Sequence, residues 1–278
     1  MGANPGMTVR FWGVRGSIAS PGPATAIYGG NTACVELRCG EHLVIFDAGT
    51  GLRALGAELA ATGKAIDADL LCSHTHLDHI SGFPFFAPNY VSGNRIRIWA
   101  GHTAAKGDIG AVFGMTLTPP LFPNVTGSFK AEIEFKDFVC GETFSPRPGM
   151  TVKTGALNHP GGACGYRVEW AGKSAAYITD TEPREGGLDQ AVLALADHAD
   201  IAIYDANYTD ADYAPHAGWG HSTWQDAVKI ARQAKVKTLV LFHHDPSRND
   251  AMLDKIAAEA AKAHPGTVVA REGLVLPL

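Results

Sequence analysis

The chain has 278 residues, of which 46% are hydrophobic and 18% are charged. This composition is ordinary for a globular protein and excludes a fibrous or disordered one. The length suits one large domain, and we expect a single domain over residues 1–278. The 23 Lys and Arg against 28 Asp and Glu give a formal net charge of −5, which disfavours long nucleic acids and anionic membranes as partners.

The cysteines and the N-terminal residues indicate the cellular compartment in which the protein is expected. An odd number of cysteines with no C-x-x-C pair argues against a disulfide framework and favours a reducing compartment. The start of the chain lacks the pattern of a secretory signal, and no apolar run approaches the ~20 residues that span a bilayer. We therefore expect a cytoplasmic protein without a membrane segment. Its five thiols are expected to be buried and structural: Cys34, Cys39, Cys72, Cys140 and Cys164.

The first half of the chain alternates short apolar runs with turn residues. One Ala- and Leu-rich stretch, residues 52–62, predicts a helix that Thr50 starts and Gly63 ends. The apolar runs contain many β-branched residues, which is typical of strands. Strands are predicted at 8–12, 33–38, 42–47, 69–73 and 95–100.

Residues 101–149 differ from the rest, because they are rich in Gly, Pro and Phe. We interpret this stretch as an insertion over one edge of the fold, where lids and pocket walls often lie. A tolerated surface insertion without such a role is the alternative.

The second half repeats the strand-rich pattern. Ala171 and Gly172 predict a two-residue hairpin turn. Strands in meanders, rather than strict β-α-β alternation, favour two sheets packed on each other with helices outside. Strands are predicted at 151–157, 164–170, 174–179, 200–205 and 238–242, and helices at 188–197, 222–234 and 249–263.

The strongest chemical signal is the motif H-x-H-x-D-H, which follows an apolar strand as His74, His76, Asp78 and His79. In extended backbone, residues two apart point the same way, so His74 and His76 converge on one side. A turn after them directs Asp78 and His79 to a second position. Imidazole and carboxylate together suit Zn²⁺, with Mn²⁺ and Fe²⁺ as alternatives. The competing interpretation is a polar turn with coincidental histidines.

This motif resembles that of the metallo-β-lactamase-fold hydrolases, and the resemblance extends over nearly the whole chain. It implies an α/β (α+β) fold, an αββα sandwich of two mixed β-sheets with helices on the outer faces and metals at one edge. Upstream, Asp47-Ala48-Gly49 resembles the D-x-G turn that supports the metal loop in this family. A plain strand-to-helix turn capped by Thr50 is an equally good interpretation of these residues.

The resemblance also implies the remaining metal ligands. His159 ends a strand where the third histidine of the family stands, and Asp180 follows a hairpin strand where the bridging carboxylate stands. β-Lactamases proper usually have Cys there, so Asp180 indicates a hydrolase of phosphoesters, thioesters or lactones. The last ligand follows a C-terminal strand, where we choose His243 and keep His244 as the alternative.

Gly220-His221-Ser222-Thr223 is similar to a stretch in the ribonuclease Z and phosphoribosyl cyclic phosphodiesterase branches. There the histidine is not a ligand but contacts the phosphate or leaving group, and an acidic residue ending the preceding strand pairs with it. Here that residue is Asp205. The alternative is that Ser222 or Thr223 simply caps the following helix.

Two further comparisons with these branches concern the substrate. Arg15, Ser17 and Asn31 lie in glycine-rich segments like those of the branch and are candidates for contact with an anionic substrate, although a structural loop explains them as well. The chain lacks the cysteine-rich zinc ribbon of some phosphoribosyl cyclic phosphodiesterases and an obvious basic arm for gripping transfer RNA.

These observations predict a binuclear metallohydrolase that cleaves a small, cyclic or open, nucleotide or ribose phosphodiester. A hydroxide between two metals, Zn²⁺ first, attacks the phosphorus, because the metals lower the pKa of water towards 7. Asp78 aims the nucleophile, and His221, oriented by Asp205, assists the leaving group. Alternatives are a lactonase or thioesterase, or a non-catalytic metal sensor; a homodimer is an open expectation. The first metal is assigned to His74, His76 and His159, the second to Asp78, His79 and His243, and Asp180 bridges them.

Overall fold

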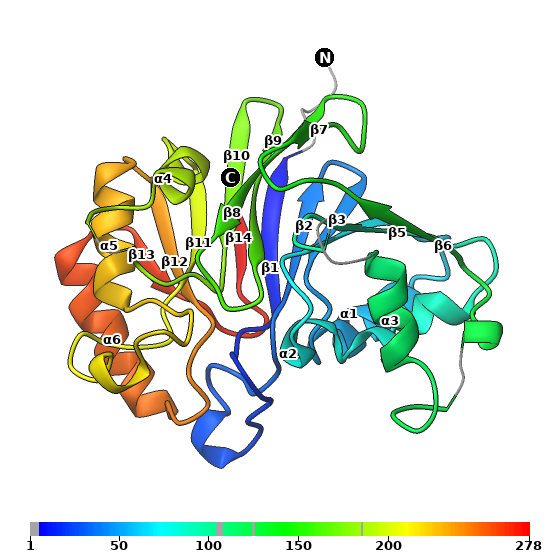
Figure 1. Ribbon diagram of the computed structural model, residues 1–278, viewed down its shortest axis with the longest axis horizontal. Helices are drawn as coiled ribbons and strands as arrows, with labels where there is room; N and C mark the ends of the chain where they lie inside the picture. Colours follow the sequence, from blue (N-terminus) through cyan, green and yellow to red (C-terminus); the bar gives the residue numbers. More distant parts are fainter. Residues whose placement is uncertain (1–5, 104–107, 124–125, 185) are drawn as a thin grey trace.

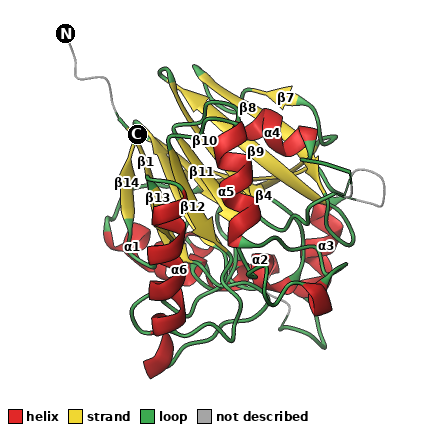
Figure 2. Ribbon diagram, turned by 90° about the vertical axis from the view of Figure 1, so that its left-hand side faces the viewer, coloured by secondary structure: helices red, strands yellow, loops and turns green. Residues whose placement is uncertain are grey.

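The computed structural model describes residues 6–103, 108–123, 126–184 and 186–278. Two seven-stranded sheets lie face to face, as Figures 1 and 2 show. The first sheet has the strand order β14-β1-β2-β3-β4-β5-β6. Its strands are β1 (Met7–Gly13), β2 (Cys34–Cys39), β3 (His42–Phe46), β4 (Asp67–Cys72), β5 (Arg95–Ala100), β6 (Glu132–Asp137) and β14 (Val275–Pro277).

The second sheet has the order β13-β12-β11-β10-β9-β8-β7. Each sheet contains parallel and antiparallel pairs, so both are mixed, as predicted. Its strands are β7 (Thr143–Phe144), β8 (Met150–Leu157), β9 (Ala163–Trp170), β10 (Lys173–Ile178), β11 (Ile201–Asp205), β12 (Thr238–Phe242) and β13 (Thr267–Val269).

Helices cover the outer faces of both sheets (Figure 1). Helices α1 (Leu52–Ala61) and α3 (Ile109–Thr116) pack on the first sheet, and α4 (Gln190–Ala196), α5 (Trp224–Gln233) and α6 (Asp250–Ala263) pack on the second. The short helix α2 (Leu77–Ile80) follows the carboxyl end of β4. The predicted αββα sandwich is therefore confirmed.

The core lies in three apolar layers, because each sheet is buried on both faces. The layer between the sheets is rich in aromatic rings, with Phe46 stacked on Tyr177 at 4.8 Å between ring centroids. Two further layers lie under the helices, one on each outer face. Strands buried on both faces read as continuous apolar runs, which is why the sequence revealed most of them.

Sequence and structure differ at several element ends. Helix α1 has Gly51, not Thr50, as its N-cap, and no side chain caps it. The Thr50 hydroxyl instead accepts a hydrogen bond from the Thr32 amide at 2.9 Å and donates to Asn31 at 3.0 Å. The hairpin turn is as predicted, with Ala171 and Gly172 both at positive φ (50° and 79°), as a type I′ turn requires.

Residues 101–149 contribute structure that the sequence did not predict. Strand β6 pairs with β5 at an edge of the first sheet, and β7 pairs with β8 at an edge of the second. The β6 sequence Glu-Ile-Glu-Phe-Lys-Asp carries four charged residues, and for this reason it was not predicted as a strand. Whether the segment acts as a lid stays a prediction.

Strand direction determines where side chains can gather. Strands β3 to β6 are parallel to one another, and so are β10 to β13. Their carboxyl ends are where ligand sites form in open sheets of parallel strands. The residues that follow β3, β4, β10, β11 and β12 therefore meet at one edge of the sandwich.

Candidate metal centre

Three residues of the site leave their strands with an unusual backbone conformation. Asp47 directly follows β3, Asp180 follows β10 by two residues, and His243 directly follows β12. All three have positive φ, at 58°, 55° and 62°. Residues other than glycine adopt this left-handed region infrequently, and such conformations gather at functional sites. The turn away from each strand brings these side chains together at the sheet edge.

The first group of donors consists of His74, His76 and His159. The His159 Nε2 lies 3.1 Å from the His76 Nδ1. The His74 ring lies 4.5 Å from that of His76 and 4.7 Å from that of His159, between centroids. Nitrogens bound to one tetrahedral zinc ion at about 2.0–2.1 Å are roughly 3.3 Å apart. This spacing is that of three ligands around a common ion.

The second group consists of Asp78, His79 and His243. The His79 Nε2 lies 3.1 Å from the His243 Nε2 and 3.2 Å from an Asp78 oxygen, Oδ2. The same oxygen is 3.3 Å from the His243 Nε2. Two ring nitrogens and one carboxylate oxygen therefore converge on a single point.

Asp180 lies between the two groups. Its Oδ1 is 3.7 Å from the His74 Nε2 and 3.8 Å from the His159 Nε2. Its Oδ2 is 3.3 Å from the Nε2 atoms of both His79 and His243. Each oxygen of this buried carboxylate thus faces a different group of donors, which is the arrangement that a bridging ligand needs.

The protonation of two rings fits metal binding. The His159 Nδ1 donates to the Gly220 carbonyl at 2.9 Å, and the His79 Nδ1 faces the Asp47 carboxylate at 2.8 Å. A hydrogen on Nδ1 leaves the Nε2 lone pair directed into the cluster, as in known metal sites. The His74 Nε2 is buried with no hydrogen-bond partner, and a bound ion or water accounts for such a group. The donor set therefore fits divalent metal ions.

The electrostatics of the cluster also favour bound cations. Burial and the neighbouring His79 lower the pKa of His74 well below its usual value, so its ring stays neutral. Burial would raise the pKa of Asp180, but His243 and His79 outweigh it and lower that pKa well below the usual value. A neutral imidazole and an ionised carboxylate are the forms that bind metal.

His221 is held by a buried carboxylate beside the cluster. Its Nδ1 lies 2.9 Å from an Asp205 oxygen, and Asp205 also accepts from the Thr181 and Asn207 amides. Burial would lower the pKa of His221, but the charges of Asp205 and Asp180 raise it to about 9. Thr223 caps α5 by accepting from the Asp226 amide at 3.1 Å, so capping and the histidine coexist in this stretch.

The alternative ligand, His244, points away from the cluster. Its Nε2 donates to the Ala270 carbonyl at 2.9 Å, and its ring meets Tyr28 edge-on. Burial lowers its pKa to about 3, so the ring is neutral. The structure places His243, and not His244, among the donors.

Of the three loop residues proposed as substrate contacts, one lies against the cluster. The Ser17 amide donates to the Asp78 Oδ2 at 2.7 Å. Arg15 is fully buried and donates to the Gly29 and Arg248 carbonyls. Asn31 donates to Glu272 through its backbone and side chain. Arg15 and Asn31 therefore shape the loop.

Two residues that support the donors were not predicted from the sequence. Tyr177 donates to Asp47 at 2.8 Å from the opposite sheet. Within a buried strand, its sequence context does not distinguish it from a tyrosine that only packs in the core. The Asn207 amide lies 3.2 Å from the His243 Nδ1. Asn207 stands two residues after Asp205, so the rule that alternate residues share a side was a usable signal.

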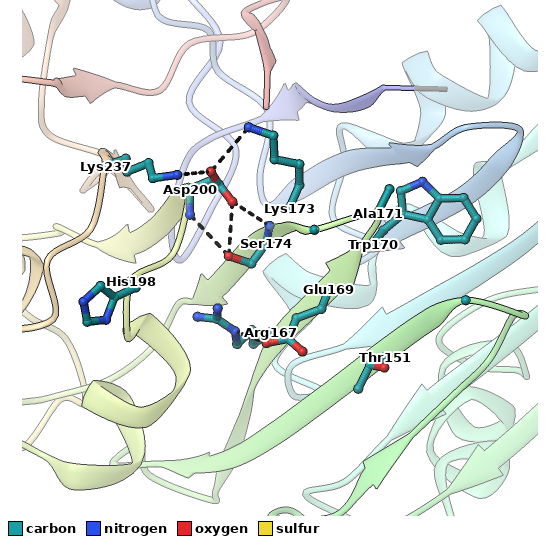
Figure 3. A pocket seen from close by; sticks show the side chains of 12 residues that line it. Thr151, Arg167, Glu169, Trp170, Ala171, Lys173, Ser174, His198, Asp200 and Lys237 are labelled. Atoms are coloured by element: carbon teal, nitrogen blue, oxygen red, sulfur yellow. Dashed lines mark hydrogen bonds and ion pairs between the residues drawn. The ribbon is translucent and has the colours of Figure 1, made fainter. Parts of the chain in front are cut away.

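Two cavities lie at opposite ends of the second sheet. One of about 640 Å³ adjoins the cluster and is lined by His159, Glu182, Arg184 and their neighbours. The other, of about 450 Å³, lies at the amino ends of β11 and β12 (Figure 3). There Asp200 is paired with Lys173 and Lys237, and it also accepts from the Ser174 amide. Its distance from the donors separates it from their chemistry.

Comparisons with known proteins agree with this geometry. The β-lactamase superfamily domain matches residues 42–244. Ribonuclease Z of Haloarcula marismortui is 25% identical, covering 96% of this chain and 94% of that protein. Ribonuclease Z of Treponema pallidum is also 25% identical, covering 88% and 91%.

Solved structures share the fold. The metallo-β-lactamase-fold protein YhfI of Bacillus subtilis is 21% identical with a TM-score of 0.72, covering 98% of this chain and all of that one. A diphosphatase of the PhnP family is 20% identical with a TM-score of 0.67, covering 97% of each chain.

Across the described residues no helix is long and apolar enough to cross a bilayer. The matched domain spans most of the chain, and it includes the H-x-H-x-D-H motif, Asp180 and His243. The clusters of histidine and aspartate are of the kind that hold divalent metals. The chain therefore belongs to the β-lactamase superfamily, has the metallo-β-lactamase fold and is similar to ribonuclease Z.

Proposed function

We propose that this protein is a binuclear metal-dependent phosphodiesterase that acts on a small nucleotide or ribose phosphodiester. The observation that carries the proposal is the position of Asp180, whose two oxygens each face a separate group of three donors. A site for one ion has no need of the second group. The similarity of this chain to ribonuclease Z and to a diphosphatase supports phosphorus chemistry over β-lactam chemistry.

We assign one ion to the group of His74, His76 and His159 and the other to the group of Asp78, His79 and His243, with zinc as the first candidate metal. When bound, two divalent ions supply a hydroxide at neutral pH and offset negative charge on the phosphate oxygens. The chain itself fixes the ligand atoms. Asp47 and the Gly220 carbonyl hold two rings by their Nδ1 atoms, and the Ser17 amide holds Asp78.

His221 is the proposed general acid. Burial lowers the pKa of the ring, but the Asp205 carboxylate 2.9 Å from Nδ1 outweighs burial and raises it, so the ring has a proton to give to a departing alkoxide. Asp205 takes the Nδ1 side, which leaves Nε2 to act on the substrate. Asp78, anchored by Ser17, is in position to accept a hydrogen bond from the attacking water.

The test is a substrate panel with purified protein reloaded with Zn²⁺ or Mn²⁺. We expect hydrolysis of bis(p-nitrophenyl) phosphate and of at least one cyclic nucleotide, and little turnover of nitrocefin or an acyl-lactone. A kcat/KM for nitrocefin or the lactone far above that of every phosphodiester would replace the proposal by a lactamase-like or lactonase reaction.

A further inference from the structure

The tryptophan that follows the cavity residue Gly218 is exposed, and its orientation is fixed by neighbouring residues. Trp219 lies in the loop 206–223 between β11 and α5, two residues before His221, and its side chain is 61% exposed. Its amide donates to the His216 carbonyl at 3.0 Å. Its ring meets the His216 ring edge-on, with centroids 5.1 Å apart and planes at 90°. A large apolar ring is thus presented to solvent in a defined orientation.

The ring that orients Trp219 is itself fixed by a row of aromatic contacts. His216 stacks on Tyr208 with centroids 4.4 Å apart and planes at 16°. Tyr208, which is buried, contacts the His221 ring at 6.1 Å. The row therefore runs from the exposed tryptophan to the proposed general acid.

Glu182 anchors the loop on both sides of Trp219. Its Oε1 accepts from the Gly218 amide at 2.7 Å and its Oε2 accepts from the Gly220 amide at 2.9 Å. The Tyr213 hydroxyl donates to the same carboxylate. A residue between two such anchors loses little conformational entropy on binding a ligand, which favours affinity.

The loop also places Trp219 next to the donors. The Gly220 carbonyl accepts from the His159 Nδ1, and Gly218 lines the 640 Å³ cavity together with His159 and Arg184. That volume suits a small molecule. Asp189 holds the Arg184 guanidinium by its Nε. The cavity therefore has a cation in its wall, beside the proposed metals, and Trp219 directly follows one of its lining residues, Gly218.

We propose that Trp219 stacks on the base of a nucleotide whose phosphate lies at the donor cluster. Aromatic rings bind bases face to face with little preference among them, because every base has a π-face. The substrates are then nucleoside phosphodiesters in preference to base-free ribose phosphates. This inference rests on the proposed phosphodiesterase activity for the reaction, but its binding step is measurable without turnover.

The test compares two ligands that differ only by the base, 5′-AMP and ribose 5-phosphate. Their Kd values are measured by calorimetry on the metal-loaded wild type and on Trp219→Ala. Base stacking predicts a roughly 5- to 150-fold rise in the Kd of 5′-AMP for the variant. The Kd of ribose 5-phosphate changes less than twofold. Trp219→Phe retains most of the 5′-AMP affinity, because it keeps an aromatic face.

Met252→Ala is the matched control, since it removes an exposed apolar side chain from α6, on the outer face of the second sheet. It leaves both Kd values unchanged. Equal weakening of both ligands by Trp219→Ala would reduce the tryptophan to a structural role and overturn the inference. A wild type that binds 5′-AMP no better than ribose 5-phosphate would also overturn it.

The two proposals fail separately. In one outcome, the wild type hydrolyses no phosphodiester while Trp219→Ala still weakens the binding of 5′-AMP but not that of ribose 5-phosphate. In that case the proposed phosphodiesterase activity is wrong and the base subsite stands. If phosphodiesters are hydrolysed and Trp219→Ala has an unaltered KM for 2′,3′-cyclic AMP and Kd for 5′-AMP, the reaction stands and the subsite is wrong.

Discussion

The hydroxyl of Tyr177 donates a 2.8 Å hydrogen bond to the Oδ2 of Asp47, the same oxygen that faces the His79 Nδ1. Tyr177 belongs to β10 in one sheet, and Asp47 follows β3 in the other. Ser73 adds its amide to Oδ1 and its hydroxyl to Oδ2. One buried carboxylate therefore joins the two sheets and orients a metal donor at the same time.

We expect Asp47→Asn to weaken metal binding by roughly 10- to 100-fold, the usual effect of losing a partner that orients a ligand. An amide is neutral, so it no longer favours the tautomer of His79 that directs Nε2 inward. Titration with a competing chelator measures the affinity.

Tyr177→Phe removes only the hydroxyl that joins the sheets, so its loss of metal affinity should be smaller. Tyr166→Phe is the matched control, because that buried hydroxyl donates to the Cys72 carbonyl instead of to Asp47. Equal affinity in Asp47→Asn and the wild type would show that the aspartate only supports the fold.

The wild type should bind two equivalents of Zn²⁺ or Mn²⁺, because two groups of three donors flank Asp180. His76→Ala and Asp180→Ala should each lose metal and activity together, whereas His198→Ala, an exposed histidine paired with Asp197, should lose neither. Elemental analysis after reloading gives the stoichiometry. A value that never exceeds one would exclude the binuclear site.

His221→Ala should keep both metals and slow the chemical step, by roughly 10²- to 10⁴-fold for a substrate with an alkoxide leaving group. Hydrolysis of bis(p-nitrophenyl) phosphate should suffer much less, because p-nitrophenolate leaves without a proton. Asp205→Asn should give the same pattern more weakly. An equal loss on both substrates would indicate that His221 binds phosphate, and a loss of metal would make it a ligand.

His244 should make the fold sensitive to acid. Its pKa is about 3 in the folded chain and about 6.5 when exposed, so between these values the unfolded state binds more protons. The free energy of unfolding therefore falls as the pH drops below about 6.5, by up to about 1.4 kcal/mol per pH unit from this one ring.

The contribution of His244 is measured by urea unfolding of the wild type and of His244→Gln at pH 7 and pH 5. The metal donors are the same in the two proteins, so their titration cancels in the difference. Glutamine keeps an N–H for the Ala270 carbonyl and has no proton to gain. The difference in stability between the two proteins should shift in favour of the variant at pH 5. A constant difference would mean that the ring titrates normally.

The sequence predicted the strands of the centre better than those of the edges. Strands β3, β10, β11 and β12 are buried on both faces over most of their length, and each contains four consecutive apolar residues. Strand β6 lies at an edge of the first sheet, and its four charged residues leave no such run. The apolar pattern of a segment therefore indicates whether it is buried. A strand that is held only by pairing with its neighbour is not revealed by that pattern.

The candidate site followed the same rule. Histidines and aspartates at strand ends are visible in the sequence because their chemistry is distinctive there. The assignment of His243 over His244 could not be derived from pattern, since the two differ only in the direction that the backbone takes at φ 62°. Tyr177 was hidden because its partner comes from a distant part of the chain.

The left-handed backbone at Asp47, Asp180 and His243 limits how this sequence can evolve. Glycine adopts that conformation without the steric cost that a Cβ brings. Selection for stability alone would move these positions towards glycine and erase a carboxylate or an imidazole each time. Keeping them is a trade between stability and activity.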